Sequence, residues 1–73
     1  MRVYVAKILI EGRNYATCNV KVSQDLQILK KYASDQMDAY VDAGGNIVEK
    51  SDLKYVMMDN NIKVTITIEG HDI

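Results

Sequence analysis

From Ile62 to Ile68, apolar and polar side chains alternate without a break in the run IKVTITI. Such alternation is typical of a β-strand with one face toward a core and the other toward solvent. The run therefore predicts a strand over residues 62–68 and a sheet with one apolar face.

The segment before this strand predicts its hairpin partner. Asn60-Asn61 suits a type I′ turn, because asparagine accepts a positive φ angle. That turn sets a register of apolar pairs on one face: Met57 with Val64, Tyr55 with Ile66, and Leu53 with Ile68. We therefore predict a strand over residues 53–58. The alternative is a short helix capped by Ser51, in which Leu53, Val56 and Met57 share a face.

The N-terminal part predicts a second hairpin, with strands over residues 2–11 and 15–22. A three-residue loop, Gly12-Arg13-Asn14, with a left-handed residue at Asn14, places two apolar sets on one face. This register pairs Ile10 with Ala16 and Ile8 with Cys18. Cys18 is therefore expected to be a small buried side chain on the core face.

Between the hairpins, helical spacing predicts one long helix over residues 24–43. Ser23 is the expected N-cap, and Gly44-Gly45 is the expected stop. One apolar stripe contains Leu26, Leu29, Ala33, Met37, Tyr40 and Val41, and an adjoining stripe contains Ile28, Tyr32, Ala39 and Ala43. Together they cover more of the helix than one sheet needs, so we expect self-association, with Ile28 and Tyr32 in the oligomer interface.

These elements predict a single α+β domain over residues 1–73. A four-stranded, mostly antiparallel sheet in the order β-β-α-β-β packs one face on the long helix, and residues 46–50 form a loop or a short extra strand. A domain of this size buries only about 60% of the surface that its unfolded chain exposes. Its core is thin, and a partner or a second copy would help it.

Composition narrows the classes of function. The net charge is −1, so no bulk attraction to nucleic acid or to anionic membranes is expected. The single cysteine cannot form an internal disulfide, which suits a reducing compartment. The sequence shows no signal peptide and no apolar run long enough for a spanning helix. We therefore expect a cytoplasmic protein without a membrane partner.

Residues that could carry chemistry are scarce. The chain has one histidine, one cysteine and no glycine-rich phosphate loop. His71 and Asp72 are adjacent, so in an extended tail their side chains point apart. We expect no catalytic residues, no metal site and no cofactor, and we interpret the chain as not an enzyme.

Three aspartates follow one another on the polar face of the predicted helix. Asp35, Asp38 and Asp42 lie in its C-terminal half, where the helix dipole disfavours negative charge and no Lys or Arg follows Lys31 within the helix. The default interpretation is a solvated face. The functional interpretation is an acidic strip that binds a basic protein surface.

The sheet face away from the helix has the opposite character in the predicted registers. It carries Lys7, Lys21, Lys54 and Lys63, with Tyr15 and several threonines. Such a face could contact phosphates and bases. An ordinary solvated face is the default, and the scattered valines, leucine and methionine also suit a dimer interface.

Two hypotheses about function result. The leading one is a small non-enzymatic interaction protein that docks a protein partner as a homo-oligomer. Its concrete form is a phage or mobile-element regulator or inhibitor that docks a host protein. The alternative is a nucleic-acid-binding protein that uses the outer sheet face.

Overall fold

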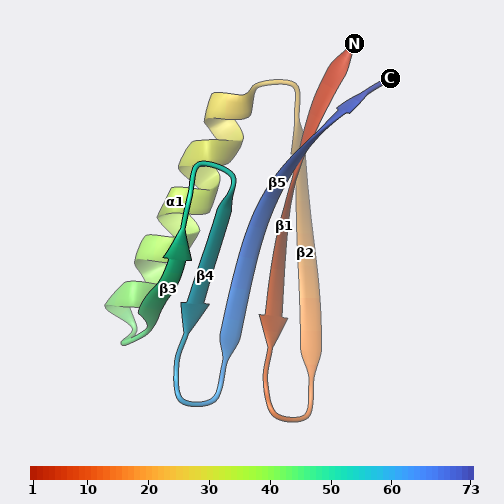
Figure 1. The fold of residues 1–73 in the computed structure, drawn as a ribbon. Helices are drawn as coiled ribbons and strands as arrows, with labels where there is room; N and C mark the ends of the chain where they lie inside the picture. The colour runs from red at the N-terminus through yellow and green to blue at the C-terminus, as the bar shows by residue number, and fades with distance from the viewer.

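The computed structural model describes all 73 residues as one helix packed on a five-stranded antiparallel sheet (Figure 1). The elements are β1 (Arg2–Glu11), β2 (Ala16–Ser23), α1 (Leu26–Asp42), β3 (Asn46–Lys50), β4 (Lys54–Met58) and β5 (Lys63–Asp72). Their order across the sheet is β2-β1-β5-β4-β3. The α+β class and the helix on one face of an antiparallel sheet are confirmed, whereas the expected number of four strands is wrong.

The additional strand is β3, at the edge of the sheet. It pairs antiparallel with β4, with a register shift between Ile47 and Glu49. Tyr55, Val56 and Met57 of β4 are buried, and buried backbone groups require hydrogen-bond partners. β3 supplies these partners along the side of β4 that β5 leaves open.

The molecule has only two layers. Helix α1 covers one face of the sheet, and the opposite face carries no further element (Figure 1). The principal extents are 41 × 23 × 16 Å, and the Cα radius of gyration is 12.5 Å. A compact domain of this length has a radius of about 11 Å. The chain is therefore elongated and thin.

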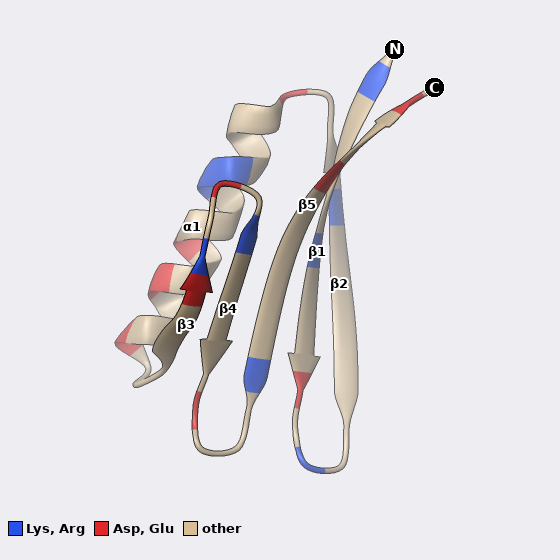
Figure 2. Cartoon of the chain, viewed as in Figure 1, with Lys and Arg blue, Asp and Glu red and all other residues tan.

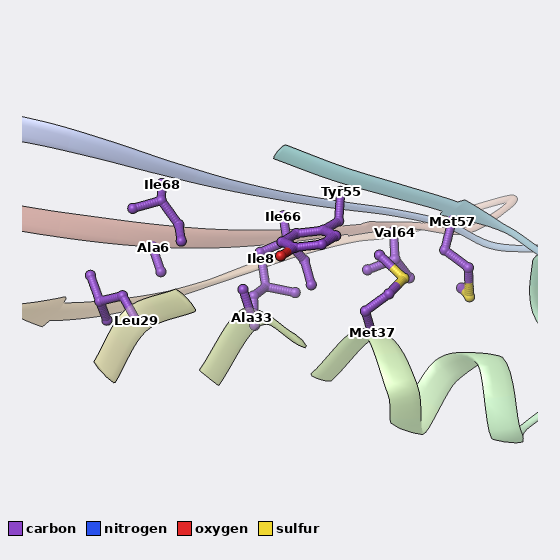
Figure 3. Packing of buried hydrophobic residues seen from close by; sticks show 10 residues of the cluster. All are labelled: Ala6, Ile8, Leu29, Ala33, Met37, Tyr55, Met57, Val64, Ile66 and Ile68. Carbon is purple, nitrogen blue, oxygen red and sulfur yellow. The ribbon is translucent and has the colours of Figure 1, made fainter. Parts of the chain in front are cut away.

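The core lies between α1 and the three central strands. Leu29, Ala33 and Met37 lie four residues apart, so they form one buried face of the helix. They meet alternate side chains of the sheet (Figure 3): Ala6, Ile8, Tyr55, Met57, Val64, Ile66 and Ile68. The strict alternation of residues 62–68 thus places Val64, Ile66 and Ile68 on the helix.

The β4–β5 hairpin confirms the predicted register. Met57 lies opposite Val64 and Tyr55 opposite Ile66, so the short-helix alternative is wrong. The turn closes with a hydrogen bond from Asp59 N to Ile62 O, but no residue other than glycine has a positive φ, so the predicted type I′ geometry is wrong. β5 also continues to Asp72, because its last residues pair with the start of β1.

The β1–β2 hairpin differs from the prediction by one residue. Gly12 N donates to Tyr15 O over 2.8 Å, so the turn is made by the two residues Arg13 and Asn14, and Asn14 is not left-handed. Glu11 therefore lies opposite Ala16, and Ile8 opposite Asn19. A shift of one residue exchanges the two faces of a strand. Cys18 lies on the face away from the helix and is exposed, which corrects its expected burial.

Helix α1 is shorter than predicted at its N-terminus. Ser23 is still extended and pairs with Tyr4 at the end of β2. The N-cap is instead Asp25, whose Oδ1 accepts from Gln27 N over 2.9 Å. At the other end Gly44 has a φ of 104°, and its N–H donates to Val41 O. The expected glycine stop is confirmed.

Candidate interaction surfaces

The three aspartates of α1 form an exposed acidic strip on the side of the helix away from the sheet. Asp35, Asp38 and Asp42 are all exposed, and at 100° per residue they lie opposite the buried face centred on Ala33. None of them belongs to an ion pair, and the last turn of the helix contains no basic residue. Figure 2 shows this acidic strip along the C-terminal half of α1.

The two residues expected in an oligomer interface lie one turn apart on a flank of α1. Ile28 is 51% exposed. Tyr32 is half-buried against the core, and Lys21 Nζ lies 4.5 Å from its ring centroid. This distance is typical of a cation–π contact. Tyr32 therefore packs within its own chain, toward β2, and Ile28 alone leaves a large apolar side chain in solvent on this flank.

The prediction that the outer sheet face is basic is wrong. The shifted register moves Lys21 to the helix side, opposite Ala6. The outer face keeps three lysines and gains one glutamate from β3: its charged residues are Lys7, Lys54, Lys63, Glu11, Glu49 and Glu69. The outer sheet face is therefore neutral, with equal numbers of lysines and glutamates.

Ion pairs further reduce the positive character of this face. Lys7 Nζ lies 3.7 Å from Glu69 Oε2, and Lys54 Nζ lies 3.6 Å from Glu49 Oε2. Lys63 is opposite Glu11 in the β1–β5 register. Tyr15, the aromatic residue expected beside the lysines, lies in the β1–β2 loop, where its ring occupies the space above Gly12. The predicted nucleic-acid residues therefore do not form one basic surface.

The shifted register adds three residues of β2 to the outer apolar surface, on which the sequence had placed Val3, Val5 and Leu9. Cys18, Val20 and Val22 of β2 face outward and lie opposite Leu9, Lys7 and Val5 of β1. With Val3 they form an outer apolar patch, which consists of Val3, Val5, Leu9, Cys18, Val20 and Val22. No element covers it (Figure 1). The three residues from β2 are exposed and the three from β1 are half-buried. Exposed apolar surface of this kind is typical of interaction sites.

Sites for small molecules or metal ions are not evident in the structure. The one depression is open and shallow, and it is lined by residues 11–13 and 58–63 at the hairpin ends. No group of three or more His, Cys, Asp or Glu side chains is placed to hold a metal ion. His71 lies beside Glu69, 3.3 Å from Nε2 to Oε2, and Asp72 pairs with Arg2 at 3.3 Å. His71 and Asp72 are adjacent in the sequence, but their side chains contact different residues and do not form one site.

The fold and surfaces define a small α+β domain with one helix-covered and one open sheet face. Comparison of this chain with protein-family models, curated proteins and solved structures finds no match. The structure contains no helix with the length and apolar character needed to cross a membrane.

Proposed function

We propose that this domain is a non-enzymatic interaction protein that docks a basic protein surface through the acidic strip of α1. The observation that carries the proposal is that Asp35, Asp38 and Asp42 are exposed and lack an ion-pair partner. Their charges repel one another and oppose the helix dipole, so the isolated domain gains no stability from them.

The small cost of such charges makes this placement tolerable. An unfavourable dipole or like-charge contribution on an exposed helix is worth about 0.3–1 kcal/mol. A row of exposed carboxylates can accelerate association with a positively charged partner, and it makes that association sensitive to salt. The acidic strip therefore suits electrostatic docking better than stabilisation of the fold.

Replacing the three strip residues together, D35N/D38N/D42N, is expected to abolish or strongly slow partner binding. The melting temperature should stay the same or rise slightly, because the substitutions remove only unfavourable charge interactions. A matched control, E11Q/D52N/D59N, removes three exposed negative charges elsewhere and should retain binding. Thermal melting and capture of an identified partner from lysate measure the two effects. Unchanged affinity in the strip variant would show that the strip is only a solvated face.

A direct titration with DNA and RNA separates this proposal from the nucleic-acid alternative. At low salt we expect no binding, because the outer sheet lysines are balanced by glutamates. Binding that falls steeply with salt, and that is lost in K7S/K54S/K63S, would contradict the proposal. It would instead assign the function to the outer sheet face.

A further inference from the structure

The two edges of the sheet differ in how they are protected from pairing with another strand. β3 has five residues, a register irregularity, and the charged residues Glu49 and Lys50. Short length, bulges and charges are the usual devices that keep an edge from pairing. β2 has eight residues in continuous register and one charge, Lys21, which is held over Tyr32 on the helix side. The β2 edge is therefore open to a further strand.

The hydrogen-bond alternation defines which residues this edge presents. Gly12 N donates to Tyr15 O, and antiparallel pairs alternate between bonded and non-bonded positions. The backbone groups of Thr17, Asn19 and Lys21 thus face β1. Those of the even-numbered residues, which are Ala16, Cys18, Val20 and Val22, face the open edge. The same four side chains point to the outer face of the sheet.

We infer that the β2 edge binds the β2 edge of a second copy of this chain, antiparallel, with the twofold axis at Asn19. This contact goes beyond the proposed function, because it uses a surface separate from the acidic strip. In this register Ala16 lies opposite the partner's Val22, and Cys18 opposite the partner's Val20. Every edge-facing residue of β2 then occupies a bonded pair.

The strand sequence is self-complementary around that axis. On the outer face, the smaller side chains Ala16 and Cys18 lie opposite the larger Val22 and Val20 of the partner. On the helix side, Thr17 lies opposite the partner's Lys21. Moving the axis to Lys21 would place two lysines directly opposite each other, which destabilises strand pairs. Moving it to Cys18 would shorten the overlap to residues 16–20. The dimer also joins the outer apolar patch to its copy across the seam, which extends the sheet to ten strands and leaves both acidic strips free.

A charge placed on the edge tests the interface. The wild-type protein is expected to elute with the mass of two 8.3 kDa chains in size exclusion coupled to light scattering. Val20→Lys should halve this mass, because it puts a charge opposite Cys18 at the seam. Val48→Lys is the matched control, since Val48 of β3 is 60% exposed and Val20 is 58% exposed. The Val48→Lys variant and the D35N/D38N/D42N variant should both remain dimers.

A cysteine at the axis tests the register independently of any loss of folding. In C18S/N19C, the two introduced cysteines face each other in a non-bonded pair, with Cα atoms about 4.5 Å apart. That separation suits a disulfide, so oxidation should yield a covalent dimer. In the wild type the two Cys18 Cα atoms are about 9 Å apart, too far for a bond without backbone movement.

Each outcome of these two experiments either supports or contradicts the proposed dimer. A covalent dimer of C18S/N19C through residue 19, with Cys18 of the wild-type protein staying reduced, supports the inference. A single-chain mass at high micromolar concentration, a dimer unaffected by Val20→Lys, or a dimer lost in Val48→Lys would each overturn it. A disulfide through Cys18 in the oxidised wild-type protein would overturn the register. Loss of the dimer only in an Ile28→Ser variant would place the interface on the helix flank.

Discussion

Replacing Ile66 with alanine is expected to lower the free energy of unfolding by about 2–5 kcal/mol. Ile66 is fully buried on the central strand β5, opposite Ile8 of β1 and Tyr55 of β4, and it faces α1 (Figure 3). A domain of this length has a total stability of about 4–11 kcal/mol. The substitution therefore removes a large part of it, and urea unfolding followed by circular dichroism should show a much lower midpoint.

The same substitution at Ile28 provides the control. Ile28 is half exposed on α1, and alanine has the higher helix propensity, so Ile28→Ala should change stability by about 0.5 kcal/mol or less. Equal losses at the two positions would contradict the core described above. A large loss at Ile28 alone would show that this side chain is buried in an interface.

The β4–β5 hairpin could be predicted in detail because burial and connection length agree. Met57, Val64 and Ile66 all have to face the same helix, which excludes a slip of one residue, and the short connection excludes a slip of two. The sequence pattern does not define the turn type, because several backbone geometries close a loop of the same length. The pairing was therefore predicted correctly while the φ angles of Asn60 and Asn61 were not.

The register of β2 could not be predicted by the same reasoning. Every residue of β2 except Ser23 is exposed, and the buried core between α1 and the sheet contains no residue of β2. Burial then does not decide which face of β2 is apolar. The β1–β2 loop sets the register of β2. Hydrophobic periodicity does not predict how this loop packs, with the Tyr15 ring over Gly12.

The one-residue shift of β2 changes both the charge and the apolar character of the outer sheet face. It removed Lys21 from the outer face, and it exposed Cys18, Val20 and Val22 there. The acidic strip did not depend on strand pairing. The placement of Asp35, Asp38 and Asp42 follows from helical spacing alone, so the sequence was sufficient to predict their common exposed face.

Enlarging Ala33 to leucine is expected to cost about 1–3 kcal/mol of stability. Ala33 is fully buried at the middle of the helix face, where α1 meets Ile8 and Ile66 of the sheet (Figure 3). The added atoms have no space there unless the helix moves away from the strands. Ala39→Leu makes the same change at an exposed position of α1 and should be nearly neutral. Thermal unfolding of both variants measures the difference, and an Ala33→Leu protein as stable as Ala39→Leu would show that the helix does not pack this closely on the sheet.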